Sequence, residues 1–342
     1  MDTQTLDIPA VTAYLRDKLP GFDGAVTATK FAGGQSNPTF LLDTPAGRYV
    51  LRRKPPGQLL KSAHAVDREF RVQAALAGSD VPVARMHLLC EDADVIGSDF
   101  YVMDHVAGRN FNEPTMDGVS NADRSAVIGD MNRVLAALHS VDVDAVGLAD
   151  YGPPGHYLER QVGRWSKQYR ASETQDIPAM NKLMERLVSE MPEDDGQRTL
   201  VHGDYRIDNM IFEADGTRCL AVLDWELSTI GHPYADLASV IMQWQLPAGA
   251  QGRGLMGVDR PALGLPSDAE FVAEYCKRRG MERVDRFGFF VAFCFFRMGA
   301  IIQGVLKRAL DGNASNPERA KQLGAFVPVF ADNGIEALKT DI

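Results

Sequence analysis

The pattern of apolar and turn-forming residues changes along the chain near residue 105, and this change limits the folds that the chain can adopt. Before it, short apolar runs are separated by turn-forming residues, which indicates a small β-sheet. These runs are Val26–Phe31, Thr39–Asp43, Arg48–Arg53 and Phe100–Met103. Residues 64–77 carry apolar positions at helical spacing and predict a helix among the strands.

Beyond a short linker, residues 105–108, the chain becomes mainly helical. The predicted helices are Ala122–Val141, Tyr157–Ala171, Ala179–Met191, Tyr234–Trp244, Asp268–Arg279, Asp285–Leu310 and Pro317–Gly334. A compact β-loop-β stretch interrupts them, with runs at Thr199–His202, Met210–Phe212 and Cys219–Leu223. We therefore predict a small N-terminal lobe over residues 1–104, a hinge at 105–108 and a large lobe over 109–342. Polar hairpin loops between two such lobes suggest a cleft, where binding sites commonly lie.

The composition argues against some classes of function. The 342 residues carry a formal net charge of −10, which argues against a sequence-independent nucleic-acid binder. The four cysteines lack CxxC spacing and a nearby histidine cluster, which argues against a zinc site and favours buried thiols in a reducing compartment.

One segment, Phe287–Leu306, has the length and apolar character of a membrane span. Arg297 lies at its centre, and a central charge costs about 2.5–3.5 kcal/mol on insertion scales, so a buried core helix is expected. The N-terminus lacks a basic-then-apolar signal pattern. We expect a cytoplasmic protein that binds neither membrane nor nucleic acid; the oligomeric state is not predicted.

The informative motif is His202-Gly203-Asp204-Tyr205-Arg206-Ile207-Asp208-Asn209, followed by Leu223-Asp224-Trp225-Glu226. Its polar residues follow or begin apolar runs, so a hairpin and its neighbour present two acids and an amide. Phosphoryl transfer needs such a set: a carboxylate to take the acceptor's proton, and oxygen ligands to hold Mg²⁺ on the nucleotide phosphates. Protein kinases place an Asn five residues after the catalytic Asp, the spacing from Asp204 to Asn209.

The combined motif resembles the aminoglycoside phosphotransferase family of kinase-like enzymes. With Gly231-His232-Pro233-Tyr234-Ala235-Asp236, it is most similar to the subgroup that includes the kinase-like domain fused to some acyl-CoA dehydrogenases. The resemblance implies an α+β, two-lobed protein-kinase-like fold with a small antiparallel sheet and a mainly helical second lobe. It implies ATP and Mg²⁺ as cofactors, Asp204 as catalytic base, and Asn209 and Asp224 as Mg²⁺ ligands.

Three further residues lie in or near this motif. Arg206 lies where a cation could neutralise the γ-phosphate in the transition state, or it forms a surface ion pair. Glu226 either approaches the metal or is structural. Asp236 is expected to brace the catalytic loop through backbone N–H groups.

The first lobe should hold the nucleotide. Gly33-Gly34-Gln35-Ser36-Asn37, between two strands, would lay backbone N–H groups over phosphates, although such a turn alone is a weak signal.

A cation on the third strand should pair with a helix glutamate. Arg52 occupies the lysine position of the Val-Ala-Ile-Lys pattern, with Lys54 as the alternative, and Glu69 is the best partner. The hinge, with Asp104, His105 and Val106, would bond adenine through backbone groups.

The acceptor is predicted to be a small-molecule hydroxyl compound, anionic rather than polycationic. The helix Tyr157–Ala171 carries Arg160, Arg164, Lys167 and Arg170 against Glu159 alone, and its Trp165 and Tyr169 could contact an acyl chain or simply pack. A hydroxy acid or hydroxyacyl-CoA fits this charge. The alternatives are an aminoglycoside, choline or homoserine kinase, a nucleotide-binding pseudokinase, and a purely structural helical domain.

Overall fold

The computed structural model describes residues 6–19, 22, 24–31, 37–55, 64–249, 253–313 and 316–340. The chain divides into two compact units that do not follow chain order. The first unit comprises Met1–Phe111, Asp144–Leu148 and Ile207–Ser228, and the second comprises Asn112–Val143, Ala149–Arg206 and Thr229–Ile342. The boundary between Arg206 and Ile207 falls inside the catalytic motif, so Asp204 belongs to the second unit and Asn209 to the first.

The first unit is built on a five-stranded antiparallel sheet with the order β1-β2-β3-β5-β4. Its strands are β1 (Thr27–Lys30), β2 (Thr39–Thr44), β3 (Gly47–Arg53), β4 (Met86–Cys90) and β5 (Phe100–Asp104). Side chains alternate between the two faces of a strand, so neighbouring residues of β3 have different surroundings. Leu51 belongs to an apolar core, and Arg52 lies on the opposite face.

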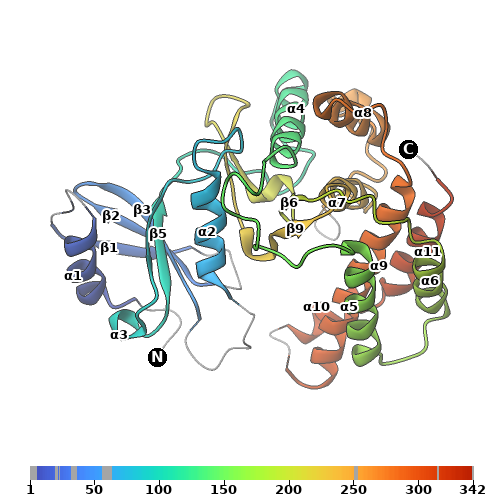
Figure 1. The fold of residues 1–342 in the computed structure, drawn as a ribbon, viewed down its shortest axis with the longest axis horizontal. Helices are drawn as coiled ribbons and strands as arrows, with labels where there is room; N and C mark the ends of the chain where they lie inside the picture. The colour runs from blue at the N-terminus through green and yellow to red at the C-terminus, as the bar shows by residue number, and fades with distance from the viewer. Residues whose placement is uncertain are drawn as a thin grey trace. The chain divides into compact units, whose positions relative to one another are not determined.

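Each face of this sheet is covered by a helix (Figure 1). On one face, α1 (Ile8–Lys18) contributes Val11 and Leu15 to the core that contains Leu51. On the other, α2 (Val66–Leu76) contacts β4 and β5. The short helix α3 (Ala93–Ile96) precedes β5. The elements α1, α3 and β4 are not among those predicted from the sequence.

A second hairpin completes the first unit. It pairs β7 (Met210–Phe212) with β8 (Cys219–Val222) and is flanked by two 3₁₀ turns, η1 (Ile207–Asn209) and η2 (Trp225–Leu227). The turn η2 packs against α2. The open end of the hairpin therefore lies beside the helix that carries Glu69.

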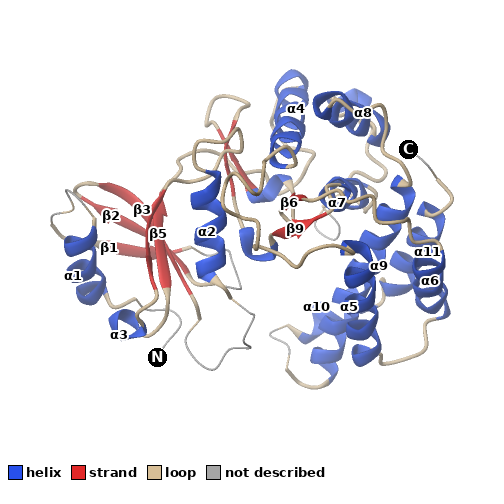
Figure 2. Cartoon of the chain, viewed as in Figure 1, coloured by secondary structure: helices blue, strands red, loops and turns tan. Residues whose placement is uncertain are grey.

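Helices make up most of the second unit (Figure 2). They are α4 (Asn121–Leu138), α5 (Tyr157–Ser172), α6 (Pro178–Ser189), α7 (Tyr234–Trp244), α8 (Asp268–Arg279), α9 (Phe287–Leu310), α10 (Pro317–Gly324) and α11 (Val327–Ala337). A short turn, η3 (Pro261–Leu263), precedes α8, and β6 (Thr199–Val201) pairs antiparallel with β9 (Thr229–Gly231).

The helix α9 forms the centre of the second unit and contacts α5, α6, α7, α10 and α11. Among the described residues it alone is long and apolar enough to cross a membrane, with a mean hydropathy of 1.9. The apolar stretch is nevertheless 67% buried inside the structure, which confirms the prediction of a buried helix.

The predicted single helix Pro317–Gly334 is wrong, because the structure contains two helices there. Pro328 lies in the first turn of α11. Proline lacks a backbone N–H and its ring clashes with the carbonyl four residues earlier, so a helix cannot pass through it unbroken. The chain ends α10 at Gly324 and begins α11 at Val327.

Candidate active site

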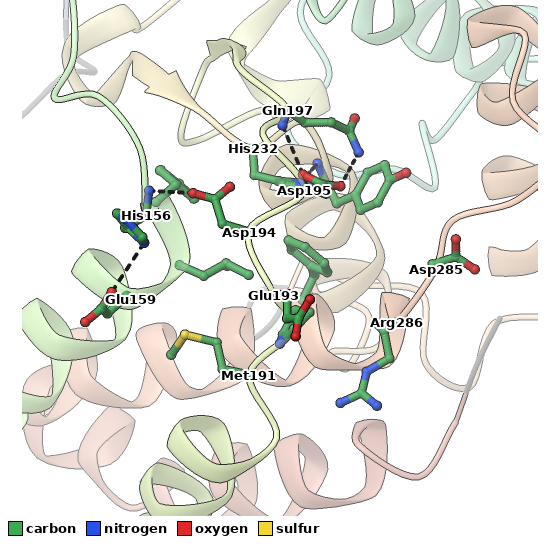
Figure 3. Close-up of a pocket in the computed structure, with 15 residues that line it drawn as sticks. His156, Glu159, Met191, Glu193, Asp194, Asp195, Gln197, His232, Asp285 and Arg286 are labelled. Carbon is green, nitrogen blue, oxygen red and sulfur yellow. Dashed lines mark hydrogen bonds and ion pairs between the residues drawn. The ribbon is translucent and has the colours of Figure 1, made fainter.

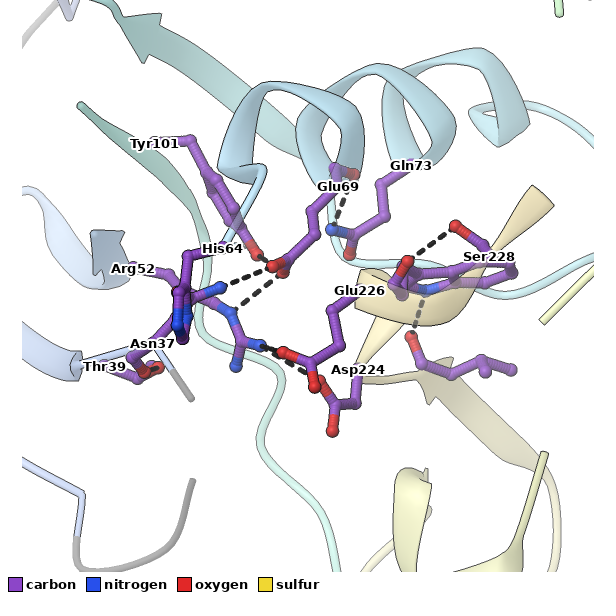
Figure 4. Close-up of polar contacts among 12 residues, drawn as sticks. Asn37, Thr39, Arg52, His64, Glu69, Gln73, Tyr101, Asp224, Glu226 and Ser228 are labelled. Carbon is purple, nitrogen blue, oxygen red and sulfur yellow. Dashed lines mark hydrogen bonds and ion pairs between the residues drawn. The ribbon is translucent and has the colours of Figure 1, made fainter. Parts of the chain in front are cut away.

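Arg52 is the centre of a charged cluster in the first unit (Figure 4). Its Nε lies 2.8 Å from Oε2 of Glu69, and its Nη2 lies 2.9 Å from Oδ1 of Asp224. Oε2 of Glu226 lies 3.6 Å from the same Nη2. Three carboxylates thus surround one guanidinium, and the predicted ion pair between Arg52 and Glu69 is present.

Three separate elements bring this cluster together. Strand alternation directs Arg52 toward the face of the sheet that α2 covers, and Glu69 lies in the first turn of α2. Asp224 comes two residues after the end of β8 and has a left-handed backbone, with φ of 65°. A non-glycine residue in that region carries local strain of about 1–3 kcal/mol, and such residues concentrate at functional sites.

Glu69 is held by further buried partners. The side-chain amide of Asn37 donates to Oε1 of Glu69 at 2.7 Å, and the Tyr101 hydroxyl donates to Oε2 at 3.1 Å. Nδ1 of His64 lies 2.9 Å from Oδ1 of Asn37. Asn37 is fully buried and turns its side chain to Glu69. The other predicted phosphate-loop residues, Gly33, Gly34, Gln35 and Ser36, lie outside the described residues.

The cluster shifts the pKa of both partners in the central ion pair. Burial alone would lower the pKa of Arg52, but Glu69, Asp224 and Glu226 outweigh it and raise that pKa, so the guanidinium stays charged. Burial raises the pKa of Glu69, and Arg52 opposes this rise. The pair is therefore sensitive to the loss of either member.

Lys54, the alternative phosphate ligand, is engaged elsewhere. Its Nζ lies 2.5 Å from Oδ2 of Asp99 and 3.8 Å from Oδ1 of Asp67. Of the two candidate cations, Arg52 is the one that contacts Glu69 and Asp224. Whether it also contacts phosphates stays a prediction.

The hairpin end brings the two predicted metal ligands onto adjacent chain segments. The backbone N–H of Leu223 donates to the carbonyl of Asn209 at 2.8 Å, one residue before Asp224. Carboxylate and amide oxygens are suitable Mg²⁺ ligands, and the excess of carboxylates over guanidinium favours a divalent cation.

In the described part of the chain, no three His, Cys, Asp or Glu side chains form a ready-made metal cluster. Mg²⁺ is usually held by one or two carboxylates together with substrate phosphates, so the residues present fit that mode of binding.

The predicted hinge residues have structural partners. The N–H of Asp104 donates to the carbonyl of Arg85 at 2.9 Å, and the N–H of His105 donates to the carbonyl of Arg48 at 3.2 Å. Oδ1 of Asp104 also lies 2.6 Å from Nε2 of His87. Adenine recognition by Asp104, His105 and Val106 stays a prediction, and the two donors named are engaged in holding the sheet edge.

The catalytic loop lies in the second unit and is held by Asp236 of α7. One oxygen of Asp236 accepts from the N–H of His202 at 2.6 Å, and the other accepts from the N–H of Gly203 at 2.8 Å. The predicted bracing role of Asp236 is therefore confirmed. The N–H of Asp204 in turn donates to Nδ1 of His202 at 3.2 Å.

A buried histidine supports this brace. His139 approaches Oδ2 of Asp236 at 3.4 Å through Nε2 and the Tyr275 hydroxyl at 2.7 Å through Nδ1. Burial lowers the pKa of His139 although Asp236 opposes this. The pKa of Asp236 is lowered because His139 and the loop N–H groups outweigh the effect of burial.

Two arginines contact the catalytic loop. Nε of Arg206 lies 3.5 Å from Oδ1 of Asp204, which places it beside the predicted base. Nη2 of Arg297 donates to the carbonyl of Gly203 at 2.8 Å. In the sequence, Arg297 stands out only as a charge within an apolar helix. That isolated charge is the signal that could have marked it as a site residue.

A cavity of about 420 Å³ lies elsewhere in the second unit (Figure 3). Its lining includes Glu193, Asp194, Asp195, His232 and Asp285. Asp195 lies 3.3 Å from Nε2 of His232, while Asp194 accepts from the backbone N–H of His156 at 2.8 Å. None of the predicted catalytic or metal residues lines it, so it is separate from the catalytic loop.

Comparison with known proteins identifies the class. The chain belongs to the phosphotransferase enzyme family, whose profile matches residues 27–284. It is 42% identical over 343 residues to acyl-CoA dehydrogenase family member 11 of Mus musculus, covering 97% of this chain and 43% of that protein. It is 43% identical over 333 residues to family member 10 of the same species, covering 96% and 31%. The chain thus spans less than half the length of these relatives.

Solved structures agree with this assignment. A protein from Ralstonia eutropha, provisionally described as an aminoglycoside phosphotransferase, is 46% identical with a TM-score of 0.90, covering 98% of this chain and 99% of that one. A thermostable aminoglycoside phosphotransferase mutant, solved with AMP-PNP and hygromycin B, has a TM-score of 0.62 at 16% identity, covering 96% and 98%. The predicted family and the two-lobed kinase-like fold are confirmed.

Proposed function

We propose that the chain is an ATP- and Mg²⁺-dependent kinase that phosphorylates a hydroxyl of a small anionic molecule, such as a hydroxy acid or hydroxyacyl-CoA. The observation that carries this proposal is the cluster around Arg52. Kinase-like enzymes bind their nucleotide with a similar arrangement. A cation on a strand pairs with a helix glutamate and with the aspartate after the catalytic hairpin.

The chemistry follows from the residues. Asp204 would accept the proton of the acceptor hydroxyl while the hydroxyl oxygen bonds to the γ-phosphorus. The bond from the γ-phosphorus to the bridging oxygen breaks, and ADP leaves. Mg²⁺ bound by Asn209 and Asp224 would neutralise charge on the phosphates. Arg52 would hold the α- and β-phosphates, and Arg206, beside Asp204, would stabilise charge on the transferred group.

The acceptor class rests on charge. The helix α5 carries Arg160, Arg164, Lys167 and Arg170, and Arg297 of α9 reaches the catalytic loop. A polycationic acceptor would need carboxylates in these positions. The relatives named for acyl-CoA dehydrogenases add support for an acyl-CoA or a related acid.

Three other functions remain as alternatives. An aminoglycoside kinase is the first, because one structural neighbour was solved with hygromycin B. A choline- or homoserine-type kinase would share the fold with a different acceptor. A pseudokinase would lack a catalytic or metal residue, whereas Asp204, Asn209 and Asp224 are all present.

The test is a screen of ATP consumption across hydroxy acids, hydroxyacyl-CoAs, amino alcohols and aminoglycosides, with Asp204→Asn as the blank. We expect turnover with the first two classes only. Turnover of kanamycin-like sugars alone would overturn the acceptor class. Near-wild-type turnover by Asp204→Asn would overturn the catalytic assignment.

We also propose that the protein acts in the cytoplasm, without nucleic acid or membrane partners. All four cysteines are buried, which suits a reducing compartment. Cell fractionation tests this proposal, and recovery in the membrane fraction would contradict it.

A further inference from the structure

Arg297 is an unusual residue in its helix. It interrupts a run of buried apolar side chains in α9, and its guanidinium donates to the carbonyl of Gly203. Gly203 directly precedes Asp204, so a positive charge is fixed next to the predicted base. A charge is not needed for this bond, because an uncharged amide could donate to the same carbonyl.

A second arginine lies nearby on α5. The guanidinium carbon of Arg164 lies 5.0 Å from the centre of the Trp165 ring, and that of Arg297 lies 5.7 Å from the same centre. Trp165 is buried, so the indole provides a fixed surface that both cations share. Burial lowers the pKa of Arg164, and the charge of Arg297 lowers it further.

Both arginines have neutral partners. Nη2 of Arg164 donates to Oε1 of Gln161 at 3.0 Å, and Arg297 donates to a backbone carbonyl. Among the residues that the structure describes, no carboxylate lies within ion-pair distance of either. By contrast, Arg170 on the same helix pairs with Glu173 at 2.6 Å.

The two positive guanidinium groups around one indole repel each other unless an anion binds between them. Guanidinium groups are well suited to bind carboxylates and phosphates, because their N–H groups match those anions in pairs. Without a bound anion this repulsion persists, and the binding of an anion would relieve it.

We propose that Arg164 and Arg297 form the subsite that binds the anionic group of the acceptor, carboxylate or phosphate, beside the catalytic loop. This inference rests on the proposed kinase function and makes it more specific. Arg164 binds the anion, while Arg297 contacts both the bound anion and the loop that carries Asp204.

The experiment compares Arg164→Gln with Arg164→Lys and with the matched control Arg170→Gln, using 3-hydroxybutyryl-CoA as acceptor. Arg164→Gln should raise the acceptor KM about tenfold or more and leave the KM for ATP unchanged, since one charged hydrogen-bonding partner is lost. Arg164→Lys should restore part of the loss, and Arg170→Gln should behave like the wild type.

Arg297→Gln tests the second member. Glutamine keeps a donor for the Gly203 carbonyl and removes the charge, so a rise in acceptor KM with an unchanged ATP KM is expected. An unchanged acceptor KM in both Arg164→Gln and Arg297→Gln would overturn the subsite. If Arg297→Gln does not fold, the result for Arg164→Gln decides.

Calorimetric binding of coenzyme A in the absence of ATP separates this inference from the proposed function. If no acceptor is phosphorylated but Arg164→Gln weakens coenzyme A binding about tenfold, the kinase proposal fails and the anion subsite stands. If the acceptor is phosphorylated and its KM is unchanged in both Arg164→Gln and Arg297→Gln, the subsite fails and the kinase stands. If the wild type neither binds coenzyme A nor phosphorylates an anionic acceptor, both are overturned.

Discussion

The surroundings of Arg52 and those of the catalytic loop differ in their charged groups. In the first unit, three carboxylates contact one guanidinium. In the second, Arg206 approaches Asp204, and Arg297 contacts the residue before it. The first arrangement suits a divalent cation with a nucleotide, and the second suits an anionic acceptor.

The two regions also differ in how they are held. In the first unit, side chains from three elements hold one another, with Glu69 bonded to Asn37, Tyr101 and Arg52. In the second, Asp236 fixes the backbone of the loop. Mutations should therefore perturb charge in the first unit and loop geometry in the second.

The largest effect is expected at the proposed metal ligand. Asp224→Ala should raise the Mg²⁺ concentration for half-maximal rate about tenfold or more, because a direct carboxylate ligand is lost. A Mg²⁺ titration of the initial rate measures this. Glu213→Gln, on the same hairpin and paired with Arg218, is the control. An unchanged Mg²⁺ dependence would refute the role of Asp224.

The next effect concerns the buried ion pair. Glu69→Gln should lower the free energy of unfolding by about 3 kcal/mol, because Arg52 loses its most buried partner. Urea denaturation measures this loss, with the exposed Glu159→Gln as control. A loss below about 0.5 kcal/mol, the range of ordinary surface changes, would show that the pair does not stabilise the first unit.

A smaller stability effect is expected in the second unit. Asp236→Asn keeps one acceptor oxygen for two loop N–H groups, so about 1–3 kcal/mol of stability should be lost. The value of kcat should fall while nucleotide binding, measured by calorimetry, is retained. Equal losses of kcat and of nucleotide affinity would contradict a role confined to the catalytic loop.

The smallest effect is a pH dependence. The pKa of His139 is lowered below its usual 6.5 in the folded protein, so the unfolded chain binds more protons and stability falls as pH drops below that value. The groups that face His139 are Asp236, Tyr275 and Arg279. Urea midpoints of the wild type and His139→Gln at about pH 7.5 and about pH 5.5 should show a smaller fall in the variant. Equal falls would assign the dependence to other groups.

The sequence predicted what local pattern and motif spacing encode. The Arg52–Glu69 pair and the brace by Asp236 followed from motif positions, and most strands and helices followed from periodicity. The role of Arg297 did not, because its contact with Gly203 joins positions far apart in the chain. The helix α1 was missed although Asp7 caps it and Pro9 lies in its first turn, because its apolar pattern is weak.

We propose that the carboxylate-rich region binds Mg²⁺ and nucleotide, while the arginine-rich region binds an anionic hydroxyl acceptor. The most direct measurement follows the label from γ-³²P-ATP in the presence of Mg²⁺ and 3-hydroxybutyryl-CoA. We expect the wild type to place the label on the acceptor hydroxyl, and Asp204→Asn to bind ATP but transfer almost none. Label appearing only on water or on a polycationic sugar, or equal transfer by Asp204→Asn, would contradict it.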